Sequence, residues 1–167
     1  NAWVLNFVDG MQLVLQLTRD CNLACTYCYQ RHVKGPGMTP AVARRALEWL
    51  IDAGHSQIAL TYFGGEPLLN RELTESTWPQ LRQIGVARGV LVSAKISTNG
   101  TRLDRSFAHF ALETALFVSL SVDGAPAVQN EGRPFAGGCA SSGAVERALA
   151  HLVAERTPFA TYQVVTP

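Results

Sequence analysis

Short apolar segments alternate along the chain with longer segments in which apolar residues recur every three or four positions. The short segments are rich in β-branched or aromatic residues and predict five strands, over residues 11–18, 56–63, 90–98, 116–122 and 159–166. The longer segments predict four helices, over 39–54, over about 70–86, after Asp104, and after Ser141 or Ser142. This alternation is typical of repeated β-α units around a parallel sheet.

Capping residues mark several of the predicted boundaries. Thr39 and Pro40 suit the start of the first helix, and Gly54 suits its end. Asp104 suits the N-cap of the third helix. Pro79 lies inside the second helical segment and is expected to interrupt or restart it.

A fifth strand at the end of the chain would leave an open sheet edge, so we expect the fold to be truncated there. We assign residues 1–10 to a lead-in segment and residues 11–167 to one domain that is incomplete at its C-terminus. The 167 residues, 47% hydrophobic and 16% charged, suffice for one sizeable globular core.

Charge and hydropathy argue against some classes of partner and indicate the cellular compartment. A formal net charge of +1 without clustered Lys and Arg argues against binding to nucleic acid or to an anionic membrane. No apolar run approaches the roughly 20 residues that span a bilayer, and the N-terminus lacks a secretory signal pattern. We therefore expect a cytoplasmic protein.

Three of the four cysteines are crowded into the segment DCNLACTYCYQ at residues 20–30. In a reducing compartment, such thiols are more often ligands or redox groups than disulfides. A structural zinc site would need a fourth ligand such as Cys139 or His32. A redox dithiol would use Cys25 and Cys28. A four-iron cluster held by three thiolates would leave one iron free to bind a substrate or cofactor.

Polar and glycine residues follow the next three predicted strands. GGEP (64–67) follows the second strand, STNG (97–100) the third and SVDG (121–124) the fourth. Each motif alone is also an ordinary strand-ending turn. Because the carboxyl ends of parallel strands meet at one edge, we expect these motifs and the cysteines to form one site.

The C-x3-C-x2-C spacing, with Tyr27 before the last cysteine, and the GGEP motif together resemble the radical S-adenosylmethionine (radical SAM) superfamily. The resemblance implies an α/β fold, a partial (β/α)6 TIM-like barrel truncated after its fifth strand. It implies that Cys21, Cys25 and Cys28 ligate a [4Fe-4S] cluster and that S-adenosyl-L-methionine (AdoMet) binds the fourth iron. The reduced cluster would cleave AdoMet into methionine and a 5'-deoxyadenosyl radical, which abstracts hydrogen from the substrate.

The resemblance also implies contacts to AdoMet at the strand ends. Gly64 and Gly65 would let the backbone approach the methionine moiety closely. Glu66 would pair with the methionine ammonium, Pro67 would hold the turn, and Tyr27 would lie against the adenine. Contacts to the ribose hydroxyls or the carboxylate are expected from Ser97, Asn99, Ser121 and Asp123.

Four stretches resemble the peptide-modifying branch of the superfamily, which includes anaerobic sulfatase-maturating enzymes and SPASM-type maturases of ribosomally made peptides (RiPPs). These stretches are LTRDCNLACTYCY, YFGGEPLL, STNGTRLD and SLSVDGAPAVQNEGRPFAGG. The chain departs from the branch at residues 129–131, where a His-Asp-Arg-like stretch is common, but it retains Arg133. This arginine would contact the cofactor carboxylate or the substrate loop, unless it only anchors that loop at the surface.

The resemblance implies an oxidoreductase that abstracts hydrogen from a peptide or protein side chain, for oxidation or crosslink formation during RiPP-type post-translational modification. Its partners would be a precursor peptide or protein and a reductant such as flavodoxin or ferredoxin. Auxiliary [4Fe-4S] clusters are expected in sequence beyond this chain, and Cys139 is expected to have no role. A radical SAM enzyme for a small-molecule substrate and a zinc-stabilised binding module stay open as alternatives, and no residue is assigned as a catalytic acid or base.

Overall fold

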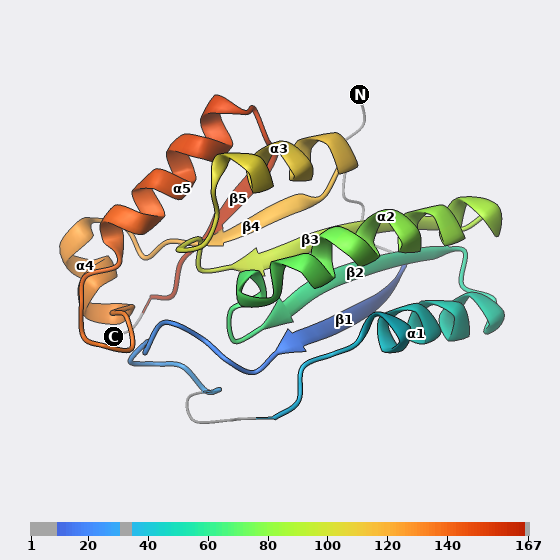
Figure 1. Ribbon diagram of the computed structural model, residues 1–167, viewed down its shortest axis with the longest axis horizontal. Coiled ribbons are helices and arrows are strands. Elements are labelled where there is room, and N and C mark those ends of the chain that lie inside the picture. Colours follow the sequence, from blue (N-terminus) through green and yellow to red (C-terminus); the bar gives the residue numbers. More distant parts are fainter. Residues whose placement is uncertain (1–9, 31–34, 166–167) are drawn as a thin grey trace.

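The computed structural model describes residues 10–30 and 35–165, so nearly all of the lead-in segment and His32 lie outside the described residues. Its strands form one parallel sheet in chain order, β1-β2-β3-β4-β5 (Figure 1). The strands are β1 (Met11–Thr18), β2 (Gln57–Gly64), β3 (Leu91–Thr98), β4 (Phe117–Ser121) and β5 (Phe159–Tyr162). An open sheet in this order has the arrangement of a partial TIM-like barrel.

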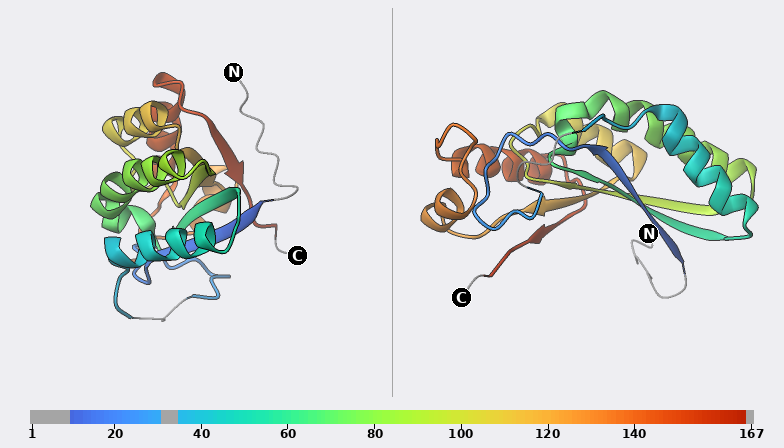
Figure 2. Two further views of the ribbon diagram at one scale, coloured as in Figure 1. Left: turned by 90° about the vertical axis from the view of Figure 1, so that its right-hand side faces the viewer. Right: turned by 90° about the horizontal axis from the view of Figure 1, so that it is seen from below.

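Four helices cover one face of the sheet, and a fifth lies beyond the carboxyl ends of the strands (Figures 1 and 2). The covering helices are α1 (Pro40–Asp52), α2 (Arg71–Ala87), α3 (Arg105–Thr114) and α5 (Ser142–Ala154). The fifth is α4 (Pro126–Gly132), and a short 3-10 helix, η1 (Pro67–Asn70), precedes α2. None of the described helices is long and apolar enough to cross a membrane.

The core lies between the sheet and the covering helices. Alternate residues of the strands point into this layer, for example Leu60 of β2, Ile96 of β3 and Leu120 of β4, all buried. Helices contribute large buried side chains, among them Trp78 and Phe107. The strands therefore present their other alternate residues on the opposite face, which no described helix covers.

All five predicted strands and all four predicted helices are confirmed, with shifted boundaries. The last strand ends at Tyr162 rather than at residue 166. Asp104 caps α3 as predicted, since its Oδ1 accepts a hydrogen bond from Phe107 N at 2.8 Å. Helices α4 and η1 were not predicted, because such short segments show too few turns of apolar periodicity.

The prediction that Pro79 interrupts the second helix is wrong, because α2 runs unbroken from Arg71 to Ala87. Pro79 removes one backbone hydrogen bond from the helix. Its neighbours Trp78 and Leu81 are buried, however, and Trp78 Nε1 donates to the carbonyl oxygen of Thr114 at 3.0 Å. Packing on both sides of the proline thus holds the helix together.

Gly85 brings α2 close to β3. A Cβ on Gly85 would lie 2.4 Å from Val92 Cγ2 and 2.9 Å from the carbonyl oxygen of Val90. We expect Gly85→Ala to lower the free energy of unfolding by about 1–3 kcal/mol, measured by chemical denaturation, because helix or strand must shift. Gly143→Ala in α5 is the control, since its nearest neighbour would lie 3.7 Å away; an equal loss in both variants would contradict the prediction.

Candidate functional site

The carboxyl ends of β1 to β4 meet at one edge of the sheet, and the cysteines lie there. We call residues 20–28, which follow β1, the cysteine loop. Cys25 is buried, Cys28 is half-buried and Cys21 is exposed, and none of them forms a disulfide. The predicted gathering of the strand-end motifs at this edge is borne out by direct contacts between them.

The turn after β2 packs against the start of the cysteine loop. Gly65 N donates to Thr18 O at 3.0 Å, and Glu66 N donates to Asp20 O at 2.8 Å. A Cβ on Gly64 would lie 2.3 Å from Thr18 O, and one on Gly65 would lie 2.3 Å from Asp20 O. The close approach of two backbones is therefore by itself sufficient to require glycine at both positions.

Glu66 is fully buried and joins the ends of β2 and β3. Its Oε1 accepts from Thr98 Oγ1 at 2.6 Å and from Leu68 N at 2.9 Å, and its Oε2 accepts from Asn99 N at 2.7 Å. Burial raises the pKa of this carboxyl, and the three donors partly oppose the rise. None of the ion pairs between described residues includes Glu66.

Asn99, at the end of β3, binds the first half of the cysteine loop. Its Nδ2 donates to Asn22 Oδ1 at 3.0 Å and lies 3.8 Å from Cys21 Sγ. Its Oδ1 accepts from Thr101 N at 3.0 Å and from Thr101 Oγ1 at 2.7 Å. Asn22 Nδ2 completes the network by donating to Thr101 Oγ1 at 2.8 Å.

Asp123, after β4, binds the second half of the loop. Its Oδ2 accepts from the Tyr27 hydroxyl and lies 2.9 Å from Arg133 Nε. The Arg133 guanidinium also lies over the Tyr27 ring, 5.3 Å from its centroid. Burial alone would raise the pKa of the Asp123 carboxyl, but Arg133, Tyr27 and Val164 N outweigh it and hold that pKa below its usual range.

A backbone ladder joins the cysteine loop to the segment after α4. Three N–H···O bonds of 2.8 to 3.0 Å connect residues 22–26 with residues 132–136, and Leu23 and Phe135 form an antiparallel bridge. Cys139 follows this segment and is exposed. The loop is thus held on one side by strand ends and on another by residues more than 100 positions away.

Several residues that organise this site were missed at the sequence level. Asn22 could have been found as the amide next to Cys21, and Thr98 by strand alternation, which turns it toward Glu66 while Ser97 faces the other side. Gln129, where the chain departs from the branch pattern, is buried and accepts a hydrogen bond from Asp123 N at 2.9 Å. No sequence signal marked that contact.

Other predicted site residues stand at the same edge. Pro67 is buried and begins η1. Ser97 and Ser121 are half-buried at the ends of β3 and β4, and neither side chain forms a hydrogen bond within residues 10–30 and 35–165. Their hydroxyls therefore retain their capacity for a ligand.

The three thiols do not converge on one point. In the described part of the chain, no three His, Cys, Asp or Glu side chains lie close enough to hold a single metal ion. A cubane cluster does not need such convergence, because each cysteine ligates a different iron. The lack of a single-ion site among the described residues therefore does not count against a cluster held by the cysteine loop.

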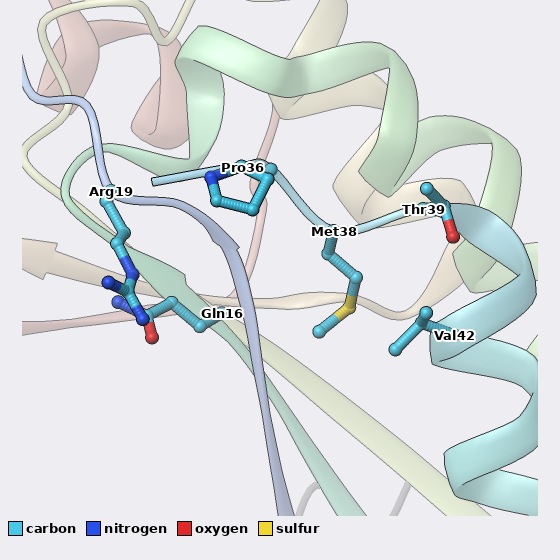
Figure 3. A pocket seen from close by; sticks show the side chains of 7 residues that line it. Gln16, Arg19, Pro36, Met38, Thr39 and Val42 are labelled. Carbon is cyan, nitrogen blue, oxygen red and sulfur yellow. The ribbon is translucent and has the colours of Figure 1, made fainter. Parts of the chain in front are cut away.

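A groove with a volume of about 340 Å³ lies beside the end of β1 (Figure 3). The side chains of Met38 and Val42 lie at one end, and those of Gln16 and Arg19 at the other. The segment before α1 forms one wall, since Met38 N donates to Leu17 O at 2.9 Å. The groove thus offers an apolar and a polar half next to the cysteine loop.

Comparison with known proteins places these features in a family. Residues 15–137 match the Radical SAM superfamily. An uncharacterized protein of Methanocaldococcus jannaschii is 31% identical over 95% of this chain and 54% of its own length. The cysteine-type anaerobic sulfatase-maturating enzyme of Clostridium perfringens is 28% identical over 92% of this chain and 44% of its own length.

Two further matches are a solved structure with bound molecules and a curated synthase. A solved structure of native anSMEcpe with bound AdoMet and Kp18Cys peptide has a TM-score of 0.83 and 28% identity, covering 92% of this chain and 43% of that chain. The pre-heme d1 synthase of Dinoroseobacter shibae is 36% identical over 83% of this chain and 31% of its own length. The chain spans about half the length, or less, of the curated relatives it matches.

Proposed function

Because the chain belongs to the radical SAM superfamily, we propose that it is the core of an oxidoreductase that binds a [4Fe-4S] cluster and AdoMet and modifies a peptide or protein side chain. The observation that carries the proposal is the direct backbone contact between the three-cysteine loop and the glycine turn, through Gly65 and Glu66. This contact unites the two motifs on which the chemistry depends.

In this proposal, Cys21, Cys25 and Cys28 ligate the cluster. When bound, the reduced cluster would supply the electron for reductive cleavage of AdoMet, and AdoMet would supply the 5'-deoxyadenosyl group that abstracts hydrogen from the substrate. The protein's part is to hold the loop in place from two strand ends. Arg133 assists electrostatically, since burial raises the pKa of the Cys25 thiol while the nearby guanidinium lowers it.

We assign the AdoMet contacts to groups at the same edge. The buried Glu66 carboxylate, which no described cation neutralises, would accept the methionine ammonium. The backbone of Gly64, Gly65 and Pro67 would line the methionine moiety. The hydroxyls of Ser97 and Ser121 and the Asp123 carboxylate would bind the ribose or contact the AdoMet carboxylate. Tyr27 would lie against the adenine, and Arg133, which pairs with Asp123, would contact the cofactor carboxylate or the substrate loop.

The peptide substrate is supported by the relatives, one of which is named a sulfatase-maturating enzyme and one of which is solved with a peptide. A small-molecule substrate is the second candidate, supported by the likeness to pre-heme d1 synthase. Mass spectrometry of a co-expressed candidate peptide separates them: loss of a pair of hydrogens supports the first, and turnover of a small molecule alone supports the second.

We also propose an electron donor, auxiliary clusters and a cellular compartment for this enzyme. A flavodoxin or ferredoxin would supply the electron, and auxiliary [4Fe-4S] clusters would lie in sequence outside this chain. The four unpaired cysteines suit the reducing cytoplasm.

Anaerobic reconstitution tests the proposal. We expect the chain to bind about four irons with sulfide and, with dithionite, to convert AdoMet into 5'-deoxyadenosine. Cys25→Ala should lose both properties, whereas Cys139→Ala, the matched control, should keep both. Binding of one zinc without sulfide would instead support a zinc-stabilised module and refute the proposal.

A further inference from the structure

Cys21 differs from the other loop cysteines in the donors that face its sulfur. Leu23 N donates to Cys21 Sγ at 3.4 Å, and Asn99 Nδ2 contacts the same sulfur at 3.8 Å. Within residues 10–30 and 35–165, no side chain donates to the sulfur of Cys25 or Cys28. Among the described residues, Cys21 is therefore the one loop cysteine whose sulfur receives a side-chain donor.

The orientation of the Asn99 amide follows from its partners. Thr101 N can only donate, and it lies 3.0 Å from one end of the amide, so that end is the oxygen Oδ1. The NH2 group must then face Asn22 Oδ1 and Cys21 Sγ, with one hydrogen for each. An amide turned the other way would place NH2 against the Thr101 N–H.

The same partners occupy all the polar capacity of the amide. Oδ1 holds two donors from Thr101, and both Nδ2 hydrogens are directed within the protein. Little remains for the AdoMet contact that the resemblance implies for Asn99. The side chain faces a cysteine sulfur instead.

We propose that Asn99 raises the reduction potential of the cluster through its N–H···S contact with Cys21, a role that rests on the proposed cluster in this loop. Hydrogen bonds to cysteine sulfurs are among the determinants of iron–sulfur potentials. The N–H withdraws electron density from the thiolate, so it stabilises the cluster more after the cluster has gained one electron. That electron comes from flavodoxin or ferredoxin, or from dithionite in vitro, which is oxidised in the same step.

A redox titration followed by electron paramagnetic resonance tests this role in the reconstituted protein. Asn99→Leu keeps the approximate size of the side chain and removes the donor. We expect its potential to become more negative, with the ratio of reduced to oxidised cluster at a fixed ambient potential falling roughly fivefold, as for the loss of one hydrogen bond. Asn130→Leu is the matched control, because Asn130 accepts a hydrogen bond from Ser142 N at 2.9 Å and contacts no cysteine.

The outcomes separate the role of Asn99 from the proposed function. Wild-type protein that binds no cluster would refute both. A cluster with the same potential in wild type and Asn99→Leu, or an equal shift in Asn130→Leu, would refute the role of Asn99 alone.

If Asn99→Leu binds no cluster, a measurement on the wild-type protein still tests the inference. Pulsed electron paramagnetic resonance of the reduced protein, labelled with 15N in its asparagine side chains, should show a weak nitrogen coupling to the cluster. The coupling should persist in Asn22→Ala, which removes the labelled side chain next to Cys21 in sequence and keeps the Asn99 donor. Its absence from the wild type would overturn the inference.

Discussion

Glu66→Ala is expected to lower the free energy of unfolding by about 3–5 kcal/mol, even without a cluster. The carboxylate is fully buried and accepts three hydrogen bonds, from Thr98, Asn99 and Leu68. Its removal strands three donors and leaves a cavity where β2 and β3 end. Denaturant unfolding of the cluster-free protein measures the loss.

Glu66→Gln refines the test through pH. Because burial raises the pKa of Glu66, the folded state binds this proton more tightly than the unfolded state does. Between the usual glutamate pKa and the raised one, wild-type stability should therefore fall as the pH rises. The glutamine variant should lack this dependence. Exposed Glu113→Ala is the control, with an expected change within about 0.5 kcal/mol, and a similar change in Glu66→Ala would contradict the prediction.

Arg133→Met is also expected to lower the free energy of unfolding, by about 3–5 kcal/mol, because it leaves the buried Asp123 carboxylate without its cation. The double variant Arg133→Met with Asp123→Asn should lose less free energy of unfolding than the two single variants together, since each substitution removes the same ion pair. Hydrogen exchange of the cysteine loop should also accelerate, because Asp123 anchors Tyr27.

The pH dependence of this pair has the opposite sign from that of Glu66. The pKa of Asp123 is lowered in the fold, so its stabilisation is present above the usual aspartate pKa and is lost as the pH falls through the lowered one. Arg133→Met should reduce this loss of stability at acid pH, measured as the free energy of unfolding from neutral to low pH. The prediction would be contradicted if the losses of the two single variants added up to that of the double variant and the acid dependence of stability stayed unchanged.

The parallel strands and the location of the site could be predicted from local patterns, whereas the consecutive strand order was implied by the resemblance to a partial barrel. Alternating apolar residues mark the strands, and the carboxyl ends of parallel strands must share an edge. The Pro79 error arose because tertiary burial of Trp78 outweighed a local rule. Short α4 lies below the length at which periodicity is informative.

The side-chain partners at the site could not be read from the sequence. Tyr27 and Asp123 are 96 positions apart, and Thr98 and Glu66 are 32 apart, so only the folded chain shows that they bind each other. The resemblance implies that Tyr27, Glu66 and Asp123 contact AdoMet, whereas the structure shows that these residues also bind other side chains of the site. The glycines at 64 and 65 illustrate the same point, since the backbone of residues 18–20 already requires them.

The ladder between residues 22–26 and 132–136 has a consequence for the order of folding. Thr26 and Gly132 are 106 positions apart, so the ladder closes only after residues 132–136 have been synthesised and have left the ribosome. Contacts of such long separation carry a large loop-closure entropy and tend to form late. We therefore expect the nascent chain to form its β1–β3 core before residues 132–136 bind the cysteine loop, so that the three thiols stay accessible until that contact forms.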